Sequence, residues 1–169
     1  MEQYTTVLEE SWLDYPDPAD NAVLLYMTGC CHHCEGCHSP LLQLCKPYAE
    51  TYEEIANKLT TYCNRAGTTK VVLLGGDPLH PHNANLTKYL LDTLSNSLDF
   101  CIFTGYSIEK VKELQLSGAK YYKCGKFDKN QYQNPQKTDS EYILASKNQN
   151  FYDSGFTQIS NDGILTFNQ

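Results

Sequence analysis

AVLLYMTGCCHHCEGC, residues 22–37, is the stretch of sequence that decides the fold. Residues 22–28 form an apolar, partly β-branched run, which is the composition of a strand that is buried on both faces. The run ends at a glycine, and four cysteines and three histidines fall between residues 27 and 40. A buried strand that leads directly into metal-binding residue types predicts a functional site at the carboxyl end of that strand.

The chain on the C-terminal side of this stretch alternates between strand and helix patterns. Apolar runs predict strands at 70–76, 100–105 and 119–124, and helical spacing of apolar residues predicts helices at 52–64, 83–95 and 107–118. Thr51 and Glu54 have the spacing of a capping box, while Ser107 and Gly118 are suited to begin and end the last helix. The alternation predicts an α/β fold with parallel strands joined by right-handed crossovers.

The last part of the chain departs from this alternation. A polar stretch follows Gly125, a short apolar segment lies at 142–145, and FTQISNDGILTF predicts a hairpin that turns at 161–163. We expect one domain over residues 1–169, with its core at about 14–149 and a C-terminal hairpin within 150–169.

Each predicted strand is followed by a polar or glycine-bearing segment. These segments are GCCHHCEGC, GGDPLHP, TGY and CGKFDKN. In parallel α/β folds ligands bind at the carboxyl ends of the strands, so the four segments are expected to converge on one active face.

Composition limits the classes of function. A chain of 169 residues can bury a core without disulfides. It has neither a secretion-like start nor a run of about 20 apolar residues, so we expect a cytoplasmic protein without a membrane span. Eight cysteines then indicate metal or redox chemistry. A net charge of −7 argues against a nucleic-acid partner and favours a protein or a small molecule.

The cysteine cluster itself allows two interpretations. Cys30, Cys34 and Cys37 have the spacing C-x3-C-x2-C, which suits a [4Fe–4S] cluster with one iron free of protein ligands. A zinc site would need a fourth ligand, and could recruit a histidine from 32, 33 or 38 or a distant cysteine. Of the other cysteines, Cys63 and Cys101 read as core residues, and the roles of Cys31 and Cys124 stay undecided.

In its position directly after the first strand, C-x3-C-x2-C resembles the signature of the radical S-adenosylmethionine (SAM) superfamily. GGDPLHP, residues 75–81, resembles the glycine-rich motif that binds the methionine amino group in that superfamily, although two glycines could also make a simple tight turn. TGCCHHCEGCHSP, LLGGDPLHP, FTGYSIEKV, CGKFDKN and ILASKNQ, in this order, are similar to the activating proteins of anaerobic ribonucleotide reductase over residues 14–149.

The resemblance implies a fold, two cofactors and a partner. The fold would be a small incomplete radical-SAM-type (βα) barrel, and the metal ligands of a [4Fe–4S] cluster would be Cys30, Cys34 and Cys37. The residues implied to bind SAM are Gly75, Gly76, Asp77 and Tyr106. Reductive cleavage of SAM would generate a glycyl radical on the large subunit of the reductase, with electrons from an external donor such as a flavodoxin.

The same motifs are compatible with other functions and other residue roles. The substrate could be another glycyl-radical enzyme, or a small molecule as in the 7-carboxy-7-deazaguanine synthases, and the chain could instead be a non-catalytic zinc-binding module. Tyr106 could simply pack at a strand end. Lys126 reads equally well as a site residue and as a surface lysine, and His80 and His82 read as packing or loop residues.

Overall fold

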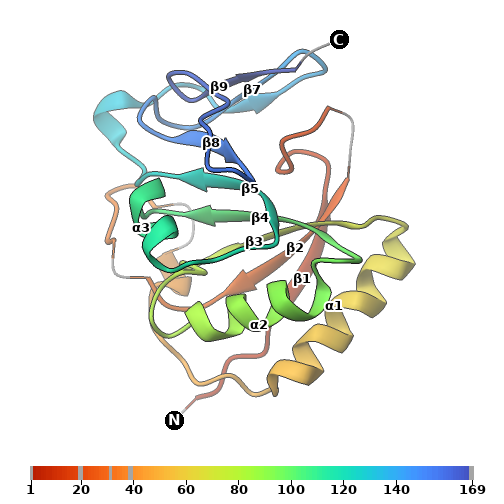
Figure 1. Cartoon of the computed structure of the whole chain (residues 1–169). Helices are drawn as coiled ribbons and strands as arrows, with labels where there is room; N and C mark the ends of the chain where they lie inside the picture. The colour runs from red at the N-terminus through yellow and green to blue at the C-terminus, as the bar shows by residue number, and fades with distance from the viewer. Residues whose placement is uncertain (1, 19–20, 31, 38–39, 168–169) are drawn as a thin grey trace.

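The computed structural model describes residues 2–18, 21–30, 32–37 and 40–167. Its centre is a sheet in the order β1-β2-β3-β4-β5-β8, and a second sheet in the order β6-β7-β9 lies beside it (Figure 1). The strands of the central sheet are β1 Val7–Ser11, β2 Ala22–Met27, β3 Lys70–Gly75, β4 Asp99–Thr104, β5 Ala119–Cys124 and β8 Asn150–Asp153. Those of the second sheet are β6 Gln136–Lys137, β7 Glu141–Ile143 and β9 Ile164–Thr166.

The central sheet is mostly parallel. Strands β2, β3, β4 and β5 run in the same direction, as the strand and helix alternation predicts, whereas β1 pairs with β2 and β8 pairs with β5 in antiparallel fashion. The two antiparallel edge strands were not predicted. Both are short and only partly buried, so neither has the continuous apolar run that marks the buried strands β2 and β3.

Helices α1 Tyr52–Ala66, α2 Ala84–Leu94 and α3 Ile108–Glu113 cover one face of the central sheet (Figure 1). The predicted capping box begins α1, because Thr51 Oγ1 accepts from the Glu54 amide at 3.1 Å and Glu54 Oε1 accepts from the Thr51 amide at 3.0 Å. The prediction that α3 continues to Gly118 is wrong. Gln115 has a φ of +53°, a left-handed conformation that a continuing helix excludes, so the helix stops before it.

Two apolar cores lie on the two faces of the central sheet. The core under the helices contains inward residues of β2 to β5 together with apolar residues of all three helices, and it includes Cys63. The core on the other face lies between the central sheet and the second sheet, and it includes Cys101. Both cysteines are almost fully buried, as the sequence predicts.

The chain turns at residues 161–163, where the Asp-Gly pair predicts it. Asp162 and Gly163 have positive φ values of 50° and 71°, and Asn161 and Ile164 exchange two backbone hydrogen bonds of 2.9 and 3.0 Å. The strands on either side of the turn, however, join different sheets: β8 pairs with β5, and β9 pairs with β7. The segment therefore connects the two sheets.

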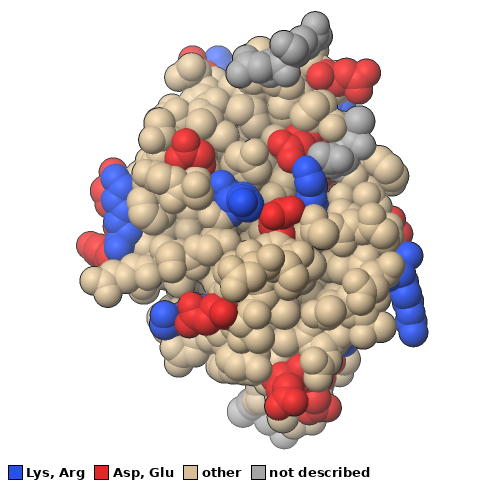
Figure 2. Space-filling model, turned by 45° about the vertical axis from the view of Figure 1, so that its right-hand side comes forward, with Lys and Arg blue, Asp and Glu red and all other residues tan. Residues whose placement is uncertain are grey.

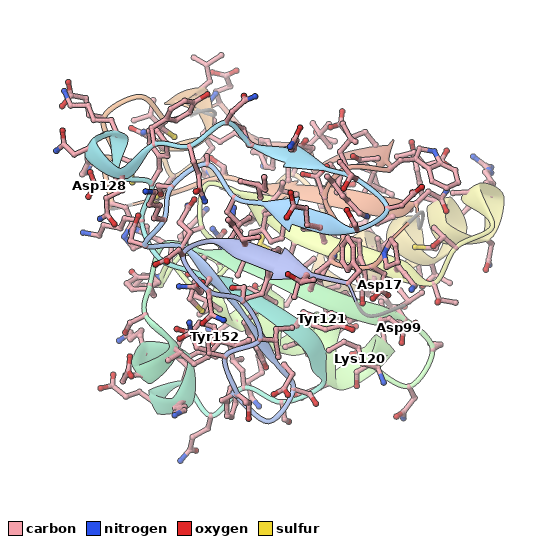
Figure 3. The ribbon with its side chains drawn as sticks, turned by 90° about the horizontal axis from the view of Figure 1, so that it is seen from above. Asp17, Asp99, Lys120, Tyr121, Asp128 and Tyr152 are labelled. Atoms are coloured by element: carbon pink, nitrogen blue, oxygen red, sulfur yellow. The ribbon has the colours of Figure 1, made fainter. Side chains whose placement is uncertain are left out.

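Polar side chains pair with one another at the amino ends of the parallel strands. At the amino ends, Lys70 Nζ binds Asp17 Oδ2 at 2.5 Å, and the Tyr121 hydroxyl donates to Asp17 Oδ1 at 3.4 Å. Figure 3 shows Asp17 and Tyr121 gathered there, with Asp128 at the opposite end. Since these contacts occupy the amino ends, the opposite end, formed by the carboxyl ends of the strands, is the one available for a functional site.

On the face drawn in Figure 2, charged side chains of both signs are scattered over a mostly uncharged surface. None of the described helices has the length and apolar character needed to cross a membrane.

Candidate active site at the carboxyl ends of the parallel strands

A cavity of about 170 Å³ lies at the carboxyl ends of β2 to β5. Its wall includes all four segments that the sequence analysis expects to converge: the residues are Cys30, His32, Cys34, Cys37, Gly75, Gly76, Asp77, Thr104, Gly105, Gly125, Lys126 and Phe127. Leu74, Phe103, Lys123 and Gln149 complete the lining. The predicted convergence of the four segments at one end of the sheet is therefore confirmed.

The described residues of the cysteine loop, residues 29–37, are held by backbone contacts at its first end and by a turn within it. The Gly29 amide donates to the Leu42 carbonyl at 2.6 Å, and the Cys30 amide donates to the Gln43 carbonyl at 3.0 Å. Farther along, the Cys37 amide donates to the Cys34 carbonyl at 3.2 Å, which folds the C-x2-C part into a turn. The anchored first end and the internal turn bring all three predicted ligand cysteines to the same cavity.

The glycine pair lies directly against the base of this loop. Gly75 has a φ of +118°, and the Gly76 and Asp77 amides each donate at 2.8 Å, to the carbonyls of Met27 and Gly29 respectively. A Cβ atom on Gly76 would lie 2.5 Å from the Gly29 oxygen and 2.7 Å from the Leu42 oxygen. The missing side chain thus allows two protein segments to approach each other.

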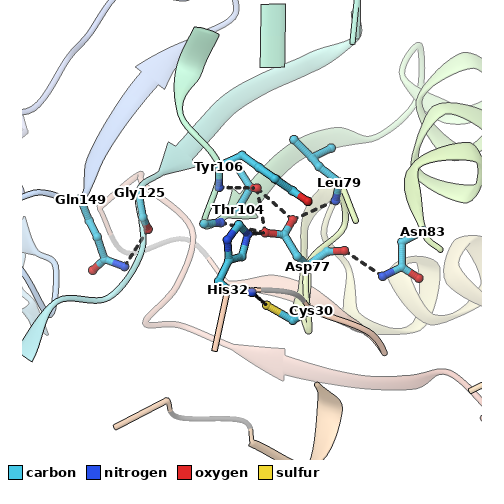
Figure 4. A network of polar contacts seen from close by, with 10 residues as sticks. Cys30, His32, Asp77, Leu79, Asn83, Thr104, Tyr106, Gly125 and Gln149 are labelled. Atoms are coloured by element: carbon cyan, nitrogen blue, oxygen red, sulfur yellow. Dashed lines mark hydrogen bonds and ion pairs between the residues drawn. The ribbon is translucent and has the colours of Figure 1, made fainter. Parts of the chain in front are cut away.

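Asp77 is the centre of a hydrogen-bond network (Figure 4). Its carboxylate is 1 % exposed and accepts bonds from the Thr104 hydroxyl at 2.9 and 3.0 Å and from the backbone amides of Gly105 and Leu79 at 2.9 Å. His32 Nε2 lies 2.6 Å from Asp77 Oδ2. The carboxylate therefore ties the cysteine loop to the ends of β3 and β4.

His32 fills the space between the cysteine loop and β4. Its side chain is 5 % exposed, and its ring meets the Tyr106 ring edge-on at 4.5 Å between centroids. A Cβ atom on Gly105 would lie 2.5 Å from the His32 ring, so that position accepts only glycine while the ring is there. Tyr106 supports His32 and is not part of the cavity lining.

The cavity lining also includes two residues that were not predicted from the sequence, Lys123 and Gln149. Lys123 Nζ lies 4.1 Å from the centre of the Phe103 ring, and among the described residues no carboxylate lies within 4.0 Å of it. Burial lowers the pKa of Lys123. Gln149 Nε2 donates to the Gly125 carbonyl at 3.3 Å (Figure 4), while its Oε1 is buried and has no hydrogen-bond partner within the described part of the chain. The period-two facing of β5 was the available signal for Lys123.

Comparison with known proteins gives the family. Residues 21–152 match the model of the 4Fe-4S single cluster domain. The anaerobic ribonucleoside-triphosphate reductase-activating protein of Enterobacteria phage T4 is 30% identical over 115 residues, which are 64% of this chain and 72% of that protein. The chain belongs to this family of reductase-activating proteins.

Bacterial members of the family are similar over a shorter span. The activating proteins of Salmonella typhimurium (strain LT2) and Escherichia coli (strain K12) are each 30% identical over 100 residues, which are 54% of this chain and 63% of theirs. The chain thus spans less than two thirds of the length of these two bacterial relatives. No solved structure matches the chain.

The donor set of the cavity fits the iron–sulfur cluster that the family model names. Cys30, Cys34 and Cys37 line the cavity, and no other described cysteine does. Cys124 is buried in the core under the helices, and burial raises the pKa of its thiol to about 12, so it stays protonated near neutral pH. Three thiolates leave one iron of a [4Fe–4S] cluster without a protein ligand. Cys31 lies outside the described residues.

Some of the other predicted residues line the cavity, and others lie outside it. Gly75, Gly76 and Asp77 line the cavity, and so does Lys126. His82 Nε2 lies 2.8 Å from the Lys46 carbonyl and its ring stacks on Tyr48, which is the loop role expected for it. His80 Nδ1 accepts from the His82 amide at 3.0 Å, in agreement with the same expectation.

Proposed function

We propose that this chain is a radical SAM activase. It would cleave SAM reductively with a [4Fe–4S] cluster and place a glycyl radical on the large subunit of the anaerobic ribonucleotide reductase. The observation that carries the proposal is that the three cysteines of C-x3-C-x2-C and the glycine turn line the same cavity. Membership of the reductase-activating family supports the choice of partner.

The residues of the chain have distinct tasks in this proposal. Cys30, Cys34 and Cys37 hold three irons, and the backbone at Gly75 and Gly76 faces the ammonium group of SAM. When bound, the cluster would supply one electron to the sulfonium of SAM, and the resulting 5′-deoxyadenosyl radical would take a hydrogen atom from the glycine of the partner. Asp77 acts by holding the cysteine loop, because four hydrogen-bonding groups already contact its carboxylate oxygens.

We also propose that the mostly parallel sheet is an incomplete (βα) barrel of the radical SAM type and that residues 1–169 act as one radical SAM domain. An external donor such as a flavodoxin would supply the electron in the cytoplasm. Tyr106 would influence SAM through its contact with His32.

The test is a turnover assay on anaerobically reconstituted protein with dithionite, SAM and the reductase large subunit. We expect 5′-deoxyadenosine, methionine and the paramagnetic resonance signal of a glycyl radical on the partner. Cys34→Ala should remove all three, because two cysteines cannot hold the cluster. SAM cleavage that Cys34→Ala leaves at the wild-type rate would refute the proposal.

The same assay separates the proposed partner from the alternatives. SAM cleavage without a radical on the reductase would keep the chemistry and move the substrate to another glycyl-radical enzyme or to a small molecule. A protein that binds zinc and never cleaves SAM would instead be the non-catalytic module.

A further inference from the structure

Three metal-binding side chains lie together on one wall of the cavity. Cys30, His32 and Asp77 each offer a ligand atom, and these atoms lie within 4.8 Å of one another. We propose that in the cluster-free protein these three residues bind one divalent metal ion, and that the site prefers Zn²⁺. Cys30 is shared with the cluster of the proposed function, so the two metal-bound forms exclude each other; this exclusion rests on that function, whereas the Zn²⁺ site does not.

The geometry needs little rearrangement to close around a metal. Ligand atoms at about 2.0–2.3 Å from a tetrahedral Zn²⁺ lie roughly 3.3–3.7 Å from one another. His32 Nε2 and Asp77 Oδ2 are now 2.6 Å apart and would separate by roughly 0.7 Å. The Cys30 sulfur is already drawn toward His32, whose backbone amide lies 3.5 Å from it.

The charges also favour a divalent ion. A thiolate, a carboxylate and a neutral imidazole carry two negative charges, which one divalent cation cancels. Cancellation matters here because the side chains of His32 and Asp77 are only 5 % and 1 % exposed, and a buried net charge is costly. Binding would release the thiol proton of Cys30 and leave the imidazole proton of His32 on Nδ1, since Nε2 becomes the ligand atom.

The surroundings supply what a metal site requires beyond its three ligands. Thr104 and the Gly105 amide hold the Asp77 carboxylate, and the Tyr106 ring fixes the His32 ring, so both ligands are oriented before a metal arrives. All three ligand residues line the cavity, which leaves room for a water molecule in the fourth position. A mixed sulfur, nitrogen and oxygen donor set suits Zn²⁺ and disfavours Mg²⁺ and Ca²⁺, which prefer oxygen.

The experiment is a titration of cluster-free, reduced full-length protein with Co²⁺ as a visible probe, followed by displacement with Zn²⁺. We expect one Co²⁺ per chain, with absorption bands of a tetrahedral ion bound by a single thiolate. The Cys34→Ser/Cys37→Ser double variant should bind Co²⁺ as the wild type does. His32→Gln should weaken binding at least tenfold, because the amide can still donate to Asp77 but is a poor metal ligand.

Two controls complete the design. His33→Gln changes the exposed neighbouring histidine and should leave Co²⁺ binding unchanged, and circular dichroism verifies that each variant is folded. Binding that survives in folded His32→Gln but is lost in the double cysteine variant would assign the metal to the three cysteines and overturn the proposal. Absence of Co²⁺ binding to the wild type would overturn it as well.

The exclusion is tested separately by adding one equivalent of Zn²⁺ before iron and sulfide. We expect Zn²⁺ to suppress cluster assembly in the wild type and to suppress it much less in His32→Gln. Equal suppression in both proteins would contradict the shared role of Cys30 and His32. If no cluster forms even without Zn²⁺, the proposed function fails while the Co²⁺ titration still decides the metal site.

Discussion

The sequence predicts that position 76 needs a glycine, and the structure supports this need for a different physical reason. The sequence predicts a glycine whose missing side chain lets a ligand approach the backbone. In the structure the space that a Cβ atom would need is occupied by backbone of the cysteine loop and of Leu42. The glycine is therefore needed first for the contact between two protein segments, and any ligand meets a backbone that this contact has already positioned.

A substitution at Gly76 tests this reading. We expect Gly76→Ala to lower the free energy of unfolding by about 1–3 kcal/mol, which is typical of overpacking, and to reduce the iron bound after reconstitution. Gly155→Ala is the matched control, because its added Cβ would lie 3.5 Å from the closest atom. Denaturant unfolding and iron analysis measure both effects. A Gly76→Ala protein with wild-type stability and iron content, and only a weaker affinity for SAM, would restore the first interpretation.

The contact between Asp77 and His32 could not be predicted from the sequence. The sequence places both residues near the predicted site, but it does not reveal that the histidine of one motif bonds the aspartate of the other, 45 positions away. Pairing of this kind depends on the exact approach of two loops, which spacing within each motif does not encode. Lys123 was missed for a related reason, since the period-two facing of β5 assigns its side chain to one face of the sheet but does not show that this face borders a cavity.

The elements were more predictable than the contacts between them. The four inner strands and the first two helices were predicted to within about two residues, because buried parallel strands and amphipathic helices leave continuous patterns. The edge strands β1 and β8 were not found, since each is only partly buried and has few residues. The early end of α3 depends on one residue with positive φ, Gln115, which is not a glycine and therefore gave no signal.

One element junction has a predictable pH dependence. Glu50 accepts from the Thr6 amide at 2.8 Å and the Thr6 hydroxyl at 2.7 Å, and it pairs with Lys58 Nζ of α1 at 2.9 Å. Burial raises the pKa of Glu50, but these hydrogen bonds and the lysine charge outweigh it, so the net pKa is lowered. A lowered folded-state pKa means that the stabilisation is present above the unfolded-state pKa and is lost as the pH falls through the folded-state value.

We therefore expect acid to destabilise the wild type more than Glu50→Gln. The difference between their free energies of unfolding should shrink by about 1 kcal/mol between pH 6 and pH 3. Denaturant unfolding at several pH values measures it. Parallel stability curves for the two proteins over this range would show that Glu50 is not linked to folding.

The start of α1 offers a second test at the scale of an element. Removing the hydroxyl in Thr51→Ala leaves the Glu54 amide without its acceptor and should cost about 1 kcal/mol of stability. Thr51→Ser keeps the oxygen and should cost little. Thermal unfolding of the two variants provides the comparison, and equal melting temperatures would mean that the cap contributes nothing measurable.

At the scale of the whole molecule, the arrangement of the sheet brings distant motifs to one end. Four parallel strands deliver the cysteine loop, the glycine turn, Thr104 and the Gly125–Phe127 segment to a single cavity, while Asp17, Lys70 and Tyr121 join at the opposite end. The cysteine loop also reaches the segment after β5, because Glu35 pairs with Lys129 at 2.6 Å. The cavity is thus bordered on several sides by elements that the topology alone places there.

We propose above that Cys30, Cys34 and Cys37 hold a [4Fe–4S] cluster whose remaining iron is open to SAM. Paramagnetic resonance of the anaerobically reconstituted, dithionite-reduced protein, recorded with and without SAM, tests it most directly. We predict the signal of a reduced [4Fe–4S] cluster that changes when SAM is added. A reduced cluster whose signal SAM leaves unchanged, or a protein that forms no cluster after careful reconstitution, would contradict the claim.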